Sequence, residues 1–101
     1  MIQGLILNTH DFDIQISENV ISQEVLLGET LLLDTSSLAY FGLDELGSLI
    51  WREMNACSDA SELYARVQSS ADLNEQILAR KFDGILSGLE AAGIISLTKQ
   101  V

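Results

Sequence analysis

Few side chains in this chain could carry out covalent or metal chemistry. His10 is the single histidine and Cys57 the single cysteine. A nucleophile needs a base beside it, and a zinc site needs several His or Cys ligands, so these two residues indicate neither. We interpret His10 as a solvated residue and Cys57 as a partly buried small hydrophobe. The acids also lack the spacing of a calcium loop. From these observations together, we expect no catalysis, no metal ion and no cofactor.

Two glycines are a more unusual feature, although they do not form a phosphate-binding loop. Gly84 and Gly88 fall inside a predicted helix, where each costs about 1 kcal/mol relative to alanine. They are four residues apart, so they share one smooth helix face, with Arg80 and Lys81 at its rim. Two apolar residues flank that face: Ile77 and Ile85. The face could hold a ligand or pack closely against the chain's own sheet, and the residues alone favour packing.

The charge balance excludes several classes of partner. The chain has 101 residues, with 15 acids against 5 bases and a formal net charge of −10. Such a surface repels nucleic-acid phosphates and anionic membranes, and no apolar run is long enough to cross a bilayer. A lone cysteine suits a reducing compartment, and residues 1–7 lack the basic region of a signal peptide. We therefore expect one cytoplasmic domain over residues 1–101 that binds neither nucleic acid nor membrane.

The first half of the chain has the alternation of β-strands. Phe12, Ile14 and Ile16 alternate with polar residues, a period of two that is typical of a half-buried strand. Three later segments continue as short strands: residues 21–27, 30–34 and 38–42. We predict an antiparallel meander over residues 12–42, joined by polar or glycine-containing turns. Residues 1–13 are an N-terminal arm of uncertain structure, in which residues 5–7 could be an edge strand, a dimer contact or a frayed end.

The second half switches to helical spacing. Asp44 can cap a first helix, and Asp59 and Asp72 each stand three residues before a glutamate, as in a capping box. The longest helix runs over about residues 73–92, and Gly93 ends it before a short extended tail. Apolar residues of the three helices should face the core, among them Leu46, Leu49, Ile50, Trp51, Met54, Phe82 and Leu89. The element order predicts an α+β, winged-helix-like fold, with a three-stranded antiparallel sheet followed by three helices.

Two other functions fit the residues poorly. An acyl carrier has an aspartate directly before its modified serine, whereas Ser48 follows Gly47, and the strands contradict an all-helical carrier. A helix-turn-helix DNA-binding unit would use the third helix for recognition, which carries Arg80 and Lys81. That helix also carries three acids, and a groove-reading helix needs more positive charge.

The chain resembles the PqqD-like family, also called RiPP recognition elements, over about residues 16–97. The resemblance depends on Leu-Leu-Leu-Asp at residues 31–34, Tyr-Phe-Gly-Leu-Asp at residues 40–44, and Gly47 followed by Ile50 and Trp51. It closes with Leu-Glu-Ala-Ala-Gly-Ile-Ile at residues 89–95. Asp44 departs from the asparagine usual in the family, but both residues cap helices well.

The resemblance implies a domain without catalysis that binds the leader of a ribosomally made precursor peptide. It would present the peptide to a modifying enzyme, such as a radical SAM protein, a leader peptidase, a cyclase or another maturase of natural-product biosynthesis. The leader would dock as an added strand between the third strand and the third helix. We place the peptide-binding residues there: Leu38, Ala39, Tyr40, Phe41, Gly42, Ile77, Arg80, Lys81, Gly84, Ile85 and Gly88. An oligomerisation or interaction module of the same fold is the alternative, and a homodimer is possible.

Overall fold

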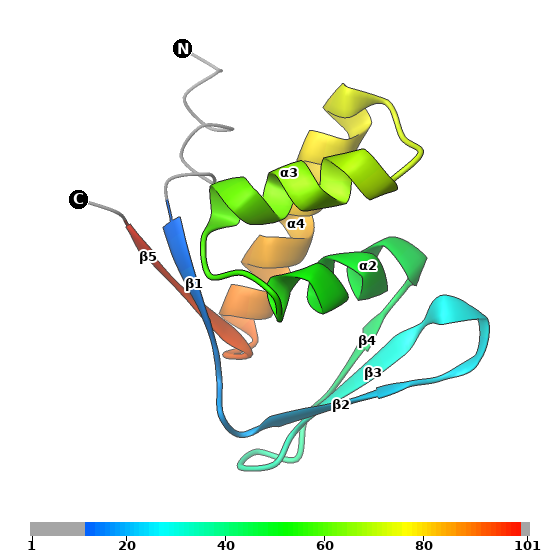
Figure 1. Cartoon of the computed structure of the whole chain (residues 1–101). Coiled ribbons are helices and arrows are strands. Elements are labelled where there is room, and N and C mark those ends of the chain that lie inside the picture. Colours follow the sequence, from blue (N-terminus) through cyan, green and yellow to red (C-terminus); the bar gives the residue numbers. More distant parts are fainter. Residues whose placement is uncertain (1–11, 100–101) are drawn as a thin grey trace.

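Two antiparallel sheets and three helices make up residues 12–99, the part of the chain that the computed structural model describes (Figure 1). The strands are β1 (Phe12–Ile16), β2 (Val20–Glu24), β3 (Thr30–Asp34), β4 (Tyr40–Leu43) and β5 (Ile95–Lys99). A 3₁₀ turn, η1 (Leu26–Gly28), joins β2 to β3, and the helices are α2 (Glu45–Met54), α3 (Ala60–Ser70) and α4 (Glu75–Ala91). The predictions for His10 and for residues 5–7 lie outside the described residues.

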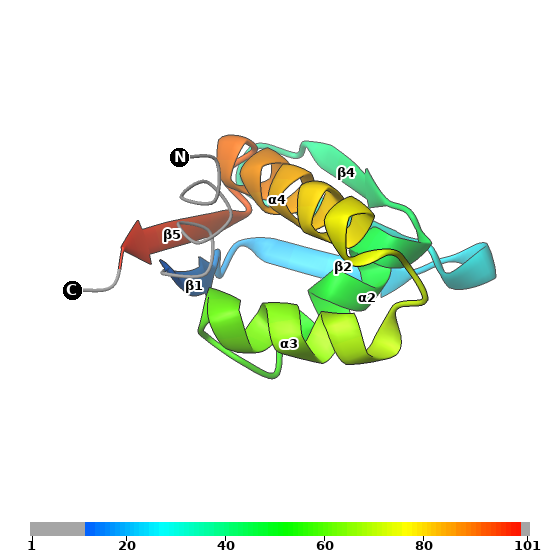
Figure 2. The same cartoon turned by 90° about the horizontal axis from the view of Figure 1, so that it is seen from above.

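The three-stranded sheet has the order β2-β3-β4, and the helices lie on one side of it (Figures 1 and 2). On the face toward the helices, Leu32 and Leu43 are buried, whereas Ile21 and Tyr40 on the other face are exposed. This alternation is what a sheet covered on one side requires. The predicted α+β fold, with a three-stranded antiparallel sheet and three helices, is confirmed.

β1 does not belong to that sheet, so the meander predicted over residues 12–42 is wrong at its first strand. β1 pairs instead with β5, which runs antiparallel to it with Ile14 opposite Leu97. The tail after α4 is therefore a strand, with Ile95 buried. The Ser17 N–H donates to the Ile94 carbonyl at 2.8 Å. Alternation identifies a strand but not its partner, and here the partner lies at the other end of the chain.

Asparagine and aspartate side chains start the helices. Asp44 Oδ1 accepts from the Gly47 N–H at 2.8 Å, and Asp59 Oδ1 accepts from the Ser61 N–H at 2.7 Å. The cap of α4 is Asn74, not the predicted Asp72, because Asn74 Oδ1 accepts from the N–H groups of Gln76 and Ile77. Because Asn74 is the cap, α4 begins two residues later than predicted and Leu73 lies in the preceding loop.

The core lies between the helices and the inner faces of the sheets. Phe82 of α4 is fully buried, and its ring meets that of Tyr64 edge-to-face with centroids 5.0 Å apart. At the end of α4, Gly93 has φ +79°, and the Ile94 N–H donates to the Leu89 carbonyl at 3.0 Å. This glycine turn directs the chain back along β1 as β5. Among residues 12–99, no helix combines the length and apolar character that crossing a bilayer requires.

Candidate functional site

Phe41 of β4 lies beside Gly88 of α4, and Figure 2 shows the strand next to the helix. A β-carbon at Gly88 would stand 3.8 Å from Phe41 Cζ, which is ordinary van der Waals contact. At Gly84, one turn earlier, a β-carbon would meet no atom within 4 Å, and the same holds at Gly42 in β4. Close packing against the sheet therefore accounts for Gly88 at most. The surface beside Phe41 is open at Gly84, whereas the Tyr40 side chain lies on the opposite face of the sheet.

The free backbone groups of β4 can be assigned from its pairing with β3. β4 is an edge strand, and Phe41 lies opposite Leu32. The Asp34 N–H donates to the Ala39 carbonyl at 3.0 Å, which fixes which residues of β4 direct their backbone groups toward β3. Because these groups alternate along an antiparallel strand, the N–H and C=O groups of Tyr40 and Gly42 point away from β3. They form an edge on which an extended peptide can add.

The turn before β4 is ordered by Asp34. Its Oδ1 accepts from the Ser36 hydroxyl at 2.7 Å and from the Ser36 N–H at 2.9 Å. These hydrogen bonds hold the pKa of Asp34 below its ordinary value, and the bond from the Ser36 hydroxyl has the largest effect. Leu38 and Ala39, predicted to open the strand, lie in this turn, and Leu38 is 69% exposed with φ +63°. The strand itself begins at Tyr40.

The predicted residues of α4 follow one flank of the helix beside its buried stripe. Ile77, Lys81 and Gly84 are exposed, whereas Ile85 and Gly88 are half-buried and nearer the core. Arg80 is exposed at the outer margin of this flank. Two other arginines of the chain are held by carboxylates, Arg52 by Glu24 at 3.9 Å and Arg66 by Glu53 at 2.9 Å. Arg80 and Lys81 form no ion pair with any of residues 12–99, so their charges are available to an anionic ligand.

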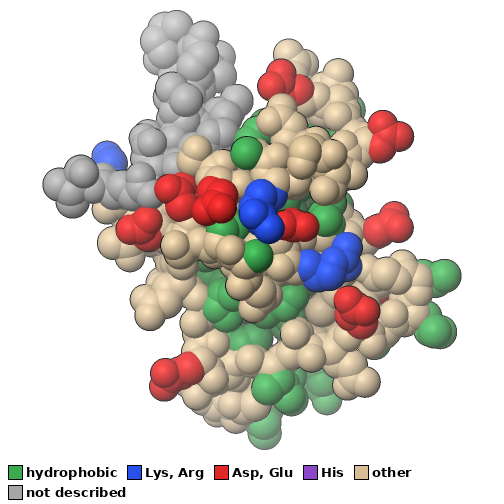
Figure 3. Space-filling model, viewed as in Figure 1, with side chains coloured by type: hydrophobic (Ala, Val, Ile, Leu, Met, Phe, Trp, Pro, Cys, Tyr) green, Lys and Arg blue, Asp and Glu red, His purple; other side chains and the backbone are tan. Residues whose placement is uncertain are grey.

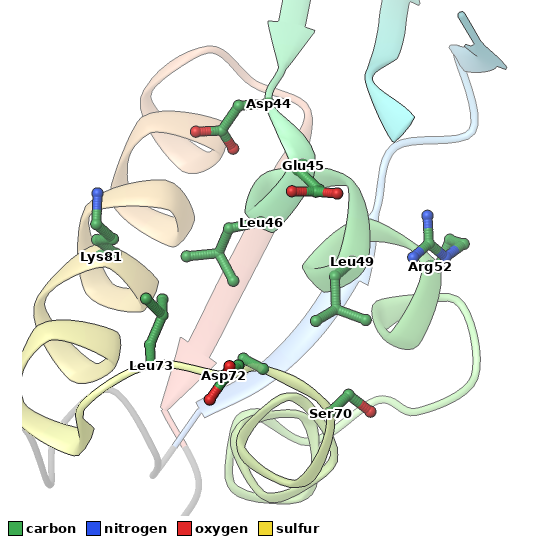
Figure 4. Close-up of a pocket in the computed structure, with 10 residues that line it drawn as sticks. Asp44, Glu45, Leu46, Leu49, Arg52, Ser70, Asp72, Leu73 and Lys81 are labelled. Carbon is green, nitrogen blue, oxygen red and sulfur yellow. The ribbon is translucent and has the colours of Figure 1, made fainter. Parts of the chain in front are cut away.

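A hollow of about 710 Å³ extends the site beyond the predicted residues, between α2, the α3–α4 loop and α4 (Figure 4). Three leucines form its apolar lining: Leu46 and Leu49 from α2 and Leu73 from the loop. Leu46 and Leu73 face each other across it (Figure 4). Lys81 borders the hollow, and four other charged residues do so as well: Asp44, Glu45, Arg52 and Asp72. An apolar side chain could be buried here beneath a charged rim.

The prediction did not include these three leucines in the site. The apolar stripe of their helix predicts that Leu46 and Leu49 face the core, and both pack against it. Each is only half-buried, however, and also lines the hollow. Leu73 is 42% exposed and stands directly before the cap Asn74. An apolar side chain in a capping loop was the signal that could have indicated the hollow.

The described residues offer no arrangement for catalysis by Cys57. Its Sγ–H donates to the Glu53 carbonyl at 3.2 Å. Burial, and then the charge of Glu62, raise the pKa of the thiol, which lowers its thiolate fraction and its reactivity. No group of three His, Cys, Asp or Glu side chains within residues 12–99 could hold a metal ion.

Two comparisons with known proteins found a match, and a third found none. A search of curated proteins found none that matches the chain. A solved structure described as TbiB1 in complex with the TbiA(beta) leader peptide shares the fold, with a TM-score of 0.71 over 81% of this chain and 94% of that chain, at 24% sequence identity. The family model of coenzyme PQQ synthesis protein D matches residues 29–95, from the end of the β2–β3 turn to the start of β5. The chain therefore belongs to the PqqD family.

Proposed function

We propose that this chain binds the leader of a ribosomally made precursor peptide as a strand added to β4, without catalysis of its own. Membership of the PqqD family supports this function, and the solved structure of similar fold contains a leader peptide. The single observation that carries the proposal is the outward-facing backbone of Tyr40 and Gly42, beside a flank of α4 that is open at Gly84.

The surface beside that edge selects a particular kind of peptide. In an added strand, alternate side chains would point toward α4, where Gly84 leaves room and Ile77 and Ile85 supply apolar contact. Lys81 and Arg80 would attract acidic side chains, since neither is neutralised by residues 12–99. The hollow lined by three leucines would take a bulky apolar anchor from the same peptide. The preferred leader is therefore amphipathic and acidic.

The bound leader would be presented to a separate modifying enzyme. The hydrogen bond and the raised pKa of Cys57 make it a poor nucleophile, and in this proposal the chemistry comes from the partner. A radical SAM enzyme, a leader peptidase, a cyclase or another maturase would fill that role.

The alternative is that the free edge of β4 pairs with a second copy of the chain. Exposed strand edges are common sites of such pairing, and Tyr40 beside that edge is 72% exposed. Two molecules that each carry a net charge of −10 repel each other, which weakens self-association at this edge.

Amide hydrogen exchange on the isotope-labelled protein tests the proposal. The probes are synthetic leaders of the small precursor-like peptides encoded beside this chain's gene. We expect the amides of Tyr40 and Gly42 to become protected on binding, while Phe41 is already protected by its pairing with β3. Ser22 on the free edge of β2 is the internal control and should stay unchanged. Protection without added peptide that rises with protein concentration would support the second copy instead, and no protection with any leader would reject the proposal.

A further inference from the structure

The turn between β2 and β3 carries exposed apolar side chains at the end of the hairpin. Leu26 and Leu27 are 83% and 89% exposed, and Val25 before them is 47% exposed. Figure 3 shows hydrophobic side chains at the right-hand edge of the molecule, where Figure 1 places this turn. Single exposed apolar residues are common, but three in succession at a projecting end indicate a contact surface. We call Val25, Leu26 and Leu27 the hairpin tip.

The backbone of the hairpin tip has a conformation that a leucine rarely adopts. Leu27 has φ +64° and ψ +33°, in the left-handed region, which asparagine and glycine accept at lower cost. The turn is nevertheless well defined, since the Val25 N–H donates to the Glu29 carbonyl at 2.8 Å. Glycine or asparagine at position 27 would form the same turn at lower cost, so the stability of the turn does not explain the leucine. Strain kept at an exposed position is typical of a functional residue.

The hairpin tip adjoins the hollow of the proposed peptide site. A β-carbon at Gly28, the residue after the tip, would lie 3.7 Å from Cγ of Glu45, and Glu45 also lines the hollow. A peptide that leaves the hollow on this side would pass beside the tip. Glu24 and Glu29 flank the tip in sequence and are exposed. Glu24 forms an ion pair with Arg52 at 3.9 Å, so the acidic border of the apolar surface depends on Glu29.

We infer that the hairpin tip docks the modifying enzyme that receives the leader, by inserting Leu26 and Leu27 into an apolar pocket edged with basic side chains. The inference rests on the proposed function, because it takes the enzyme to be the partner that must reach a peptide held in the adjacent hollow. A second copy of the chain is a poorer occupant, since it would bring the same acidic border and a net charge of −10 to the contact.

A double variant separates this surface from the leader site. Leu26→Ser with Leu27→Asn removes both apolar side chains and places at position 27 a residue that tolerates its positive φ. We expect an unchanged or higher melting temperature and an unchanged leader affinity. Affinity for a purified modifying enzyme, sought among the genes beside this one, should fall at least tenfold. Ile21→Thr is the matched control, because it removes another exposed apolar side chain of the same hairpin at 58% exposure, and it should leave both affinities unchanged.

Reversing the charge of Glu29 gives a second test of enzyme binding. Glu29→Lys should weaken enzyme binding severalfold, and the difference from the wild type should shrink as salt is raised. Wild-type affinity for the enzyme in the double variant would overturn the inference, as would an equal loss in Ile21→Thr. A dimer of the wild type that the double variant abolishes in sedimentation would also overturn it, in favour of a second copy. If the wild type binds no leader but the tip variants still lose the enzyme, the proposed function fails while the docking surface stands.

Discussion

The ring of Phe41 in β4 lies against Gly88 in α4, in the space where a side chain at position 88 would point. The distance from Phe41 Cζ to a β-carbon there would be 3.8 Å, whereas the same position at Gly84 has no neighbour within 4 Å. The two glycines therefore differ in role, although their spacing makes them look equivalent. Gly88 lies beside Phe41 with room for a methyl group, and Gly84 borders open surface.

Alanine at either glycine should stabilise the protein. Gly88→Ala adds a methyl group at contact distance from Phe41, and Gly84→Ala adds one in open space. Each change removes the helix penalty of glycine, about 1 kcal/mol, which corresponds to a rise in melting temperature of about 4–8 °C for a domain of this size. Thermal unfolding followed by circular dichroism measures it. A lower melting temperature for Gly88→Ala would mean that Phe41 packs more tightly than this distance indicates.

A bulky residue at Gly84 should block the leader without unfolding the domain. Gly84→Leu fills the open space beside β4, so we expect leader affinity to fall at least tenfold while the circular dichroism spectrum is unchanged. Ala65→Leu is the matched control, because Ala65 is exposed in α3 and does not line the hollow. Calorimetric titration compares the two variants. Equal loss in both, or unfolding of Gly84→Leu, would count against an open peptide site.

Reversing the charge of Lys81 should weaken binding of an acidic leader. Lys81 is exposed and borders the hollow, and it forms no ion pair with residues 12–99. We expect Lys81→Glu to reduce affinity about three- to tenfold at low salt, and the effect should diminish near 1 M salt because exposed charges are screened. Lys99→Glu in β5 makes the same change of net charge away from the site. If both variants lose equal affinity, the total charge matters and the position of Lys81 does not.

The parts of the fold set by local patterns could be predicted from the sequence, and those set by distant partners could not. The caps Asp44 and Asp59 depend on bonds to residues two or three positions away, so short motifs reveal them. The pairing of Ile16 with Ile95 joins opposite ends of the chain, which alternation cannot indicate. Likewise, the helical stripe of α2 predicts that Leu46 faces the core. It cannot show that Leu46 also lines the hollow, because another part of the lining comes from the α3–α4 loop.

Truncation of Leu46 should affect binding more than stability, unlike truncation of its neighbour Ile50. Ile50 is fully buried, so Ile50→Ala should cost about 2–5 kcal/mol of unfolding free energy. Leu46 is half-buried and lines the hollow, so Leu46→Ala should cost roughly 1–2 kcal/mol and reduce leader affinity about tenfold. Chemical denaturation and calorimetry give the two quantities. A large stability loss with unchanged affinity in Leu46→Ala would assign this leucine to the core, as its place in the helical stripe first suggested.

Cys57 should react slowly with alkylating reagents in the folded protein. Burial and the nearby charge of Glu62 raise its pKa, and only the thiolate reacts. Well below the pKa, the thiolate fraction falls tenfold for each pH unit, so the raised pKa makes the folded protein slower than a solvated thiol at any such pH. Iodoacetamide should therefore modify the native protein more slowly than glutathione at pH 8, with a rate that keeps rising toward higher pH. Protein unfolded in urea is the control, since it loses the burial and should react at the rate of an ordinary cysteine. A native rate above that of glutathione would instead show an activated thiol, and would contradict the proposal that the chain has no catalysis of its own.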